Sequence, residues 1–313
     1  MKERFQGCLL GVALGDALGA PAKGLTKEEI QTQRSLPVRA AEASTHGHDP
    51  VSSPQLPWKM AGGTDIDECN LMMLTLESIC TQRSIKTSDM VRCLKGFYRT
   101  HPQTLTPLTA HVLSRLNEGE RWEEASEGAS LDSDFNPPDG GNLPRTIPVG
   151  LYRARNIEKL VADTIEVSRL THWDDRATHS AVAINYLITR LAQNDKQALN
   201  SLDTFLADKN AGVRAAVKKG AEGAEADLDT SGLATSVVTV AVWALKNAPS
   251  FLEGLEMVIN LGGQTDLNAA VAGGLLGAKF GRLVLPEAWL FQLEGKVRVE
   301  VLANRLFEHA LNG

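Results

Sequence analysis

The sequence predicts an all-α fold, because apolar residues recur at the helical spacing i, i+3 and i+4 along most of the chain. Strand-like alternation is scarce, and aromatic residues, which strands favour, make up only 5% of the 313 residues. The composition does not shift along the chain, and no internal repeat of about 20–50 residues occurs. We therefore expect one domain covering residues 1–313 and about a dozen helices.

The first predicted helix lies in GCLLGVALGDALGAP, and its closest counterpart is LGGQTDLNAAVAGGLLGAKFG near the C-terminus. Glycine recurs at every fourth position in both segments: Gly7, Gly11, Gly15 and Gly19, then Gly273, Gly277 and Gly281. That spacing puts the missing side chains on one helix face, although each glycine costs roughly 1 kcal/mol relative to alanine. We expect the two helices to pack against each other, with Asp16 near the start of the second.

Between and beyond these two segments, the helical period predicts six further helices. They lie at Leu71–Ile79, Leu160–Leu170, Ala181–Leu191, Val237–Leu245, Leu252–Ile259 and Val297–Leu311. Two long loops interrupt the pattern, Leu36–Gly63 and Leu131–Gly141. Loops of such length are usually lids, binding loops or disordered. His46 and His48 in the first loop form a pair that either binds metal or is solvated.

Composition excludes several function classes. The net charge of −6 argues against binding to a nucleic-acid backbone. No apolar run reaches 18 residues and the N-terminus lacks a cleavage pattern, so we expect neither a membrane span nor a signal peptide. The four cysteines have no zinc-site spacing and are too few for a disulfide framework. We expect a cytoplasmic protein with reduced thiols; its oligomeric state is not predicted.

Two Gly-Gly loops place polar residues before helices. One reads Gly-Gly-Thr-Asp-Ile-Asp-Glu over residues 62–68, and the other reads Gly-Gly-Gln-Thr-Asp over residues 262–266. Their hydroxyls and carboxylates are the hard oxygen ligands that Mg²⁺ or Mn²⁺ prefers. The alternative is that Thr64, Asp65, Thr265 and Asp266 only cap their helices.

Two further loops are predicted to carry binding residues. Thr-His-Trp-Asp-Asp-Arg-Ala, with His172 and Asp174, lies at a break between two helices; the alternative is a capping turn. Gly-Gly-Asn-Leu-Pro-Arg-Thr-Ile-Pro covers residues 140–148 and contains Asn142 and Arg145. The local sequence leaves open whether Arg145 binds an anion or lies on the surface. Likewise, Trp58 and Trp173 either stack on a base or fill the core.

Taken in order, GCLLGVALGDALGAP, GGTDIDE, NLPRTIPVGL, THWDDRA and NLGGQTDLNAAVAGGLLGAKFG resemble the signatures of the ADP-ribosylglycohydrolase family, which includes the dinitrogenase reductase-activating glycohydrolase. The resemblance covers residues 4–281. It implies an all-α fold with two Mg²⁺ or Mn²⁺ ions in a central cleft. It also implies cleavage of the N- or O-glycosidic bond at C1″ of ADP-ribose, with a small-molecule riboside or an ADP-ribosylated substrate as the partner.

The chain departs from that family's pattern at four positions. Lys23 stands where the family has a glutamate that helps to hold the attacking water. Ile66 replaces an aspartate of the Thr-Asp-Asp-Thr loop, and Gln264 and Leu267 replace an aspartate and a threonine of the last loop. With fewer carboxylates, two dications would repel each other too strongly. We expect at most one ion, held by Thr64, Asp65, Asp67 and Asp266, or none.

The lysine suggests a specific hypothesis for the case without metal. The Lys23 ammonium would replace a metal ion by pairing with Asp65 or Asp266, because lysine is a compact point charge on a flexible stem. The alternative is that Lys23 points to solvent at the rim of the cleft.

We therefore expect a divergent glycoside hydrolase acting at C1″ of an ADP-ribosyl group or related riboside, with Asp65, Asp67 and Asp266 as catalytic candidates. The predicted substrate-binding residues are Asp16, Lys23, Asn142, Arg145, His172, Asp174, Gly262, Gly263 and Gln264. Two alternatives remain open. One is an inactive family member that binds ADP-ribose, a nucleotide or a protein, and the other is a purely structural or regulatory protein.

Overall fold

The computed structural model describes residues 1–32, 67–102, 105–293 and 295–312. Within these ranges the chain forms sixteen α-helices: α1 (Lys2–Gly19), α2 (Lys27–Thr32), α3 (Asp67–Gln82), α4 (Thr87–Thr100), α5 (Pro107–Glu118), α6 (Trp122–Ser130), α7 (Asn142–Tyr152), α8 (Ile157–Ser168), α9 (Asp175–Ala192), α10 (Ala198–Phe205), α11 (Ala211–Glu222), α12 (Ala234–Asn247), α13 (Phe251–Ile259), α14 (Thr265–Phe280), α15 (Glu287–Gln292) and α16 (Lys296–Asn312). Short 3-10 helices join them, namely η1 (Ala20–Ala22), η4 (Ser133–Phe135), η5 (Glu225–Asp227) and η6 (Arg282–Val284).

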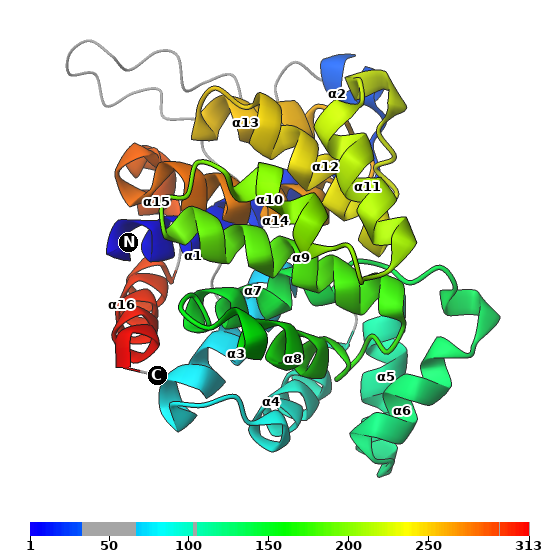
Figure 1. The fold of residues 1–313 in the computed structure, drawn as a ribbon. Helices are drawn as coiled ribbons and strands as arrows, with labels where there is room; N and C mark the ends of the chain where they lie inside the picture. Colours follow the sequence, from blue (N-terminus) through cyan, green and yellow to red (C-terminus); the bar gives the residue numbers. More distant parts are fainter. Residues whose placement is uncertain (33–66, 103–104, 294, 313) are drawn as a thin grey trace.

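The predicted all-α class is confirmed (Figure 1). Five of the six periodic segments fall in α3, α9, α12, α13 and α16, and Leu160–Leu170 extends two residues beyond the end of α8. The described residues hold more helices than the dozen we expected. Part of the difference is that α2 and α15 have only six residues each, too few to show a helical repeat. The predicted loop Leu36–Gly63, which includes His46, His48 and Trp58, lies outside the described residues.

Helices α1 and α14 pack backbone to backbone through their glycine faces, as the spacing predicted (Figure 1). A Cβ atom at Gly11 would lie 2.8 Å from the carbonyl carbon of Gly273, and one at Gly15 would overlap the carbonyl of Ala269. A Cβ atom at Gly7 would lie 2.7 Å from the carbonyl carbon of Gly281. Only glycine permits this approach, so the helix-propensity cost of these residues is offset by close packing.

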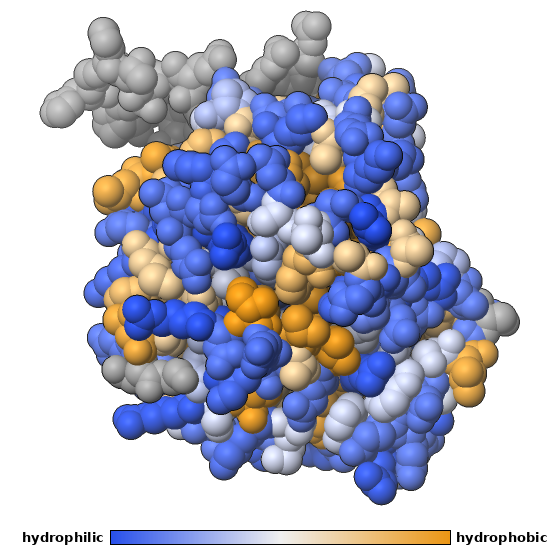
Figure 2. All heavy atoms as spheres, in the orientation of Figure 1, coloured by the Kyte–Doolittle hydropathy of each residue, from blue (hydrophilic) through white to orange (hydrophobic). Residues whose placement is uncertain are grey.

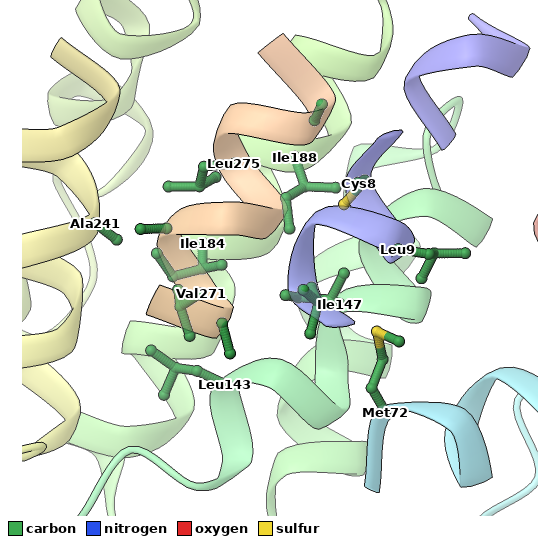
Figure 3. Close-up of a cluster of buried hydrophobic side chains, with 14 of the residues drawn as sticks. Cys8, Leu9, Met72, Leu143, Ile147, Ile184, Ile188, Ala241, Val271 and Leu275 are labelled. Atoms are coloured by element: carbon green, nitrogen blue, oxygen red, sulfur yellow. The ribbon is translucent and has the colours of Figure 1, made fainter. Parts of the chain in front are cut away.

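The core surrounds this helix pair. Side chains from α3, α7, α9 and α12 converge on it (Figure 3), including Met72, Ile147, Ile184 and Ala241, all without exposed surface. The four cysteines are free thiols, as predicted. Burial raises the pKa of the Cys80 thiol to about 11, since the apolar interior disfavours the thiolate.

Residues Lys2–Ala22, covering α1 and η1, form the one segment in the described ranges that is long and apolar enough to cross a membrane. In this fold 83% of that window is buried, and its glycine face lies on α14. Its apolar character therefore matches its role as the core helix. Hydrophilic side chains predominate on the face that Figure 2 shows, with apolar side chains in smaller patches between them.

One structural prediction is wrong. The segment 140–148 was expected to be a loop, but its residues from Asn142 onward form the start of α7. Pro144 is the third residue of that helix, where a backbone N–H has no partner within the helix and its loss is harmless. Pro148 lies inside the helix and is tolerated there because every residue of α7 is buried. Burial outweighs the local preference of proline.

Candidate functional site

Helix α14 begins directly on the end of α1. Gly262 and Gly263 have φ angles of 78° and 77°, which a side chain would disfavour, and they turn the chain into the helix. The Thr265 hydroxyl, in the first turn, donates a 2.7 Å hydrogen bond to the carbonyl of Gly19. The predicted Gly-Gly turn is therefore confirmed, and it places Asp266 beside the last turn of α1.

Helix α3 approaches α1 at Asp16, about one turn before the Gly19 carbonyl that α14 contacts. The backbone N–H of Cys69 donates to Oδ2 of Asp16 at 2.8 Å, and the Asp16 side chain is fully buried. A carboxylate is favourable there because the N-terminal end of a helix carries a partial positive charge. Two helix N-termini, those of α3 and α14, thus converge on the C-terminal half of α1.

The predicted ligands before α3 are not all described. Thr64 and Asp65 lie outside the described residues, and Asp67 is described only as the first residue of α3. Their predicted metal-binding and catalytic roles remain predictions. Glu68, the next residue, is 4% exposed.

Lys23 and Asp266 form an ion pair, with Nζ 2.6 Å from Oδ2. The Lys23 side chain is 50% exposed, whereas that of Asp266 is 7% exposed. The pairing of Lys23 with Asp266, one of the two partners predicted from the sequence, is confirmed. The buried carboxylate therefore has a half-exposed counter-ion supplied by the chain itself.

Gln264 and Leu267, two of the positions at which the chain departs from the family pattern, are both described. The side chain of Gln264 packs against Gly232, where a Cβ atom would lie 2.7 Å from Gln264 Cγ. Leu267 is 4% exposed and belongs to the hydrophobic core. Within the described part of the chain, no group of three His, Cys, Asp or Glu side chains is placed to hold a metal. This half of the site offers one carboxylate, Asp266, and it is already paired with an ammonium.

A second polar group surrounds His172. Its Nε2 lies 3.0 Å from Oδ1 of Asp139 and its Nδ1 lies 2.8 Å from the Thr171 hydroxyl. Burial acts to raise the pKa of Asp139, but the proximity of His172 and hydrogen bonds from His172, Gly141 and Thr106 outweigh it and hold the pKa below its usual range. Asp139 is a site residue that the sequence reasoning missed, because Pro138-Asp139-Gly140 reads as an ordinary turn.

Arg145 is a buried residue of α7. Its side chain is 1% exposed, and Nη2 donates to the carbonyls of Val167 and Ser168 at 3.4 and 3.2 Å. Burial lowers the pKa of Arg145 to about 10, while the negative charges of Glu68 and Asp139 act in the opposite direction. Of the two alternatives, a surface arginine is therefore wrong.

Asn142 is also buried and has partners within the protein. Its Nδ2 donates to the Ser168 hydroxyl at 2.7 Å and to the Ala177 carbonyl at 2.9 Å. Asn142, Arg145 and His172 each have a hydrogen-bond partner within the chain. Their predicted contacts with a substrate remain predictions.

Asp174 is the N-cap of α9, as the capping alternative proposed. Its Oδ1 accepts from the backbone N–H of Arg176 at 2.7 Å, and its carboxylate also pairs with the Arg176 guanidinium. Trp173 is partly buried and packs against Arg169. A surface cavity of about 520 Å³ lies here, lined by Arg169, Trp173, Asp174, Asp175, Arg176 and Asn210.

Backbone hydrogen bonds join four loops around the start of α14. Gly24 N–H donates to Gly263 O at 2.8 Å, and Gly263 N–H donates to Leu25 O at 2.9 Å. Gln264 N–H donates to Thr230 O at 3.0 Å, and Gly140 N–H donates to Gly232 O at 2.9 Å. The Asp139 loop and the start of α14 are thus connected through residues 228–233, and the Lys23 loop bonds directly to Gly263.

The sequence reasoning did not single out this connecting segment. In the structure Gly232 has a φ of 83°, and Asp229 accepts a hydrogen bond from the N–H of Ser231 in a tight turn. These are ordinary loop features, so nothing in them indicated a neighbour of the Gly-Gly loop.

The comparisons agree with this architecture. The family model for ADP-ribosylglycohydrolase matches residues 1–312. An uncharacterized protein of Archaeoglobus fulgidus is 30% identical over 98% of this chain and 97% of its own length. The ADP-ribosylarginine hydrolase Tri1 of Serratia proteamaculans is 22% identical over 97% of this chain and 79% of its own length. A solved structure described as an ADP-ribosylglycohydrolase-related protein complex superposes with a TM-score of 0.77 at 27% identity, covering 99% of this chain and 98% of that one. The chain therefore belongs to the ADP-ribosylglycohydrolase family.

Proposed function

We propose that this protein hydrolyses the glycosidic bond at C1″ of an ADP-ribosyl group or a related riboside, at a site around Lys23 and Asp266. The observation that carries the proposal is the convergence of the N-termini of α3 and α14 on α1, through Asp16 and Thr265. This arrangement brings together the two helices that follow the Gly-Gly loops of the family pattern. Family membership and the similarity to a protein named ADP-ribosylarginine hydrolase support the choice of substrate class.

The reaction needs a carboxylate to position or deprotonate water, because the bond at C1″ breaks through an oxocarbenium-like state. In this proposal Asp266 is the described candidate, with Asp65 and Asp67 as the candidates on the other loop. Lys23 balances the charge of Asp266. The proposed reaction assigns no step to a pair of metal ions; we propose at most one Mg²⁺ or Mn²⁺, because Ile66, Gln264 and Leu267 replace two aspartates and a threonine of the family pattern.

A second candidate is favoured by the replaced loop residues. Gln264 and Leu267 leave Asp266 as the one carboxylate among residues 262–268. The ammonium of Lys23 already pairs with that carboxylate. A family member that binds ADP-ribose without cleaving a bond would tolerate both features, because binding requires no base.

Release of free ADP-ribose from arginine-linked and O-linked ADP-ribosyl peptides distinguishes the two candidates. We expect turnover by the wild-type protein and a loss of at least about 100-fold in Asp266→Asn, in line with removal of a general base. The matched control is Glu158→Gln, an exposed carboxylate in the first turn of α8, which should retain wild-type turnover.

A thermal-shift measurement with ADP-ribose completes the test. Ligand at 100 times its dissociation constant stabilises by about 2.7 kcal/mol, which is readable as a shift of several degrees. No turnover with such a shift would support the non-catalytic candidate. Neither turnover nor a shift would contradict both.

A further inference from the structure

The Lys23–Asp266 pair is held in place by the backbone rather than by chance contact of two flexible side chains. Lys23 follows η1, and the next two residues bond to Gly263 in both directions, through Gly24 N–H at 2.8 Å and Leu25 O at 2.9 Å. Thr26 forms an isolated bridge with Gly262. The chain around Lys23 is thus fixed against the turn that leads into α14, three residues before Asp266.

Asp266 needs a cation at this position. Its side chain is 7% exposed, and Oδ1 is buried with no hydrogen-bond partner among the described residues. A buried carboxylate is costly unless it is paired, and a helix N-terminus compensates only part of its charge. The ammonium at 2.6 Å from Oδ2 supplies the missing charge.

A divalent ion on the same carboxylate would compete with that ammonium. The two cations would repel each other at close range in a partly buried site, where water screens poorly. Within the segment 262–268, positions 264 and 267 add no negative charge to hold both, since they are glutamine and leucine.

We propose that the Lys23 ammonium is the resident cation on the α14 side of this site and occupies the place of one metal ion. The site would then hold one divalent ion fewer than a site with two. The inference deepens the proposed function and rests on it for the location of the site, but not for the occurrence of turnover.

The test replaces the Lys23 ammonium with a carboxylate that can coordinate a metal ion. Lys23→Glu places a carboxylate beside Asp266, so the variant should unfold at a lower temperature than wild type in EDTA. Mn²⁺ should then raise the melting temperature of the variant by at least about 3 °C more than that of wild type. Metal analysis after equilibration with Mn²⁺ should find one more bound ion per chain in the variant.

Lys27→Glu is the matched control. Lys27 lies four residues along the chain, is similarly exposed and pairs with Glu225 instead of Asp266. We expect its Mn²⁺ content to equal that of wild type. Lys23→Met, which removes the cation without adding a carboxylate, should melt at a lower temperature than wild type in both EDTA and Mn²⁺, and it serves if Lys23→Glu does not fold.

Equal Mn²⁺ content in wild type and Lys23→Glu would overturn the inference, as would an unchanged melting temperature of Lys23→Met. These readouts are independent of turnover. An inactive protein with the expected metal contents would contradict the hydrolase proposal and leave the Lys23 inference standing.

Discussion

At His172 both ring nitrogens have partners, Asp139 at Nε2 and Thr171 at Nδ1, and the ring has no exposed surface. This arrangement fixes the orientation of the ring within the turn before α9. Asp139 also accepts the N–H of Gly141 at 2.9 Å and so shapes the start of α7. One carboxylate therefore positions both the histidine and the helix that carries Arg145.

Asp139→Asn should destabilise the protein at neutral pH by about 2 kcal/mol, the scale of hydrogen bonds to a charged group. The pKa of Asp139 is lowered in the folded state, so its contribution is fully present above the unfolded pKa of about 4 and is lost as the pH falls through the folded value. The difference between wild type and variant should hence be constant above about pH 5 and shrink below about pH 4. Urea denaturation at a series of pH values measures it.

Asp134→Asn is the control for this experiment, because that carboxylate lies in the same loop and is exposed. It should unfold like wild type throughout the pH range. A difference between Asp139→Asn and wild type that persists unchanged at pH 2 would contradict the assignment to the ionised carboxylate.

At the scale of helices, the contact between α1 and α14 decides where the site forms, because it brings the start of one helix to the end of the other. Gly15→Ala tests this contact. The new Cβ atom would overlap the Ala269 carbonyl and lie 2.9 Å from Ala270 N, both backbone atoms that a side-chain rotation cannot relieve. We expect a loss of at least about 2 kcal/mol in the free energy of unfolding, despite the better helix propensity of alanine. Chemical denaturation measures the change.

Gly96→Ala in α4 isolates the propensity effect. Gly96 is exposed, and a Cβ atom there would meet nothing within 4 Å. The same substitution should stabilise by about 0.5–1 kcal/mol. If both variants were stabilised, the backbone contact between α1 and α14 would not be as close as described.

The contrast between these two glycines also explains what the sequence could predict. A repeat of four residues along two apolar segments has one simple packing solution, so the α1–α14 pair followed from the sequence. The approach of Lys23 to Asp266 came from the family resemblance instead, which left Asp65 open as the other partner. The helical conformation of residues 142–148 did not follow from the sequence. Burial of the whole segment outweighs the preference of its prolines, and that burial depends on the surrounding helices. The contact of Thr230 with Gln264 and Asn268 also stayed hidden, since it depends on the position of a loop that carries no distinctive residue.

At the scale of the molecule, burial is unevenly distributed, and we expect stability to follow it. Residues 7–19 of α1 are all buried, and so are residues 265–278 of α14. Helix α6 packs on α5 and η4 at the periphery (Figure 1) and buries only Ala125, Ser126 and Ala129. A helix with so few buried contacts can open while the core stays folded.

Native-state hydrogen exchange should therefore separate the site scaffold from the periphery. We expect amides inside α1 and α14 to exchange only through global unfolding, and those of α6 to exchange at least about 100 times faster, through local opening. Gly15→Ala should lower protection in α1 and α14 by its full loss of unfolding free energy, while α6 changes less because its opening does not break the α1–α14 contact. Exchange with equal rates and equal denaturant dependence in α6 and α1 would contradict this distribution. The expected pattern would place Asp16 and Asp266 on helices that open only when the whole molecule unfolds, so that the carboxylates of the proposed site keep their positions while α6 opens.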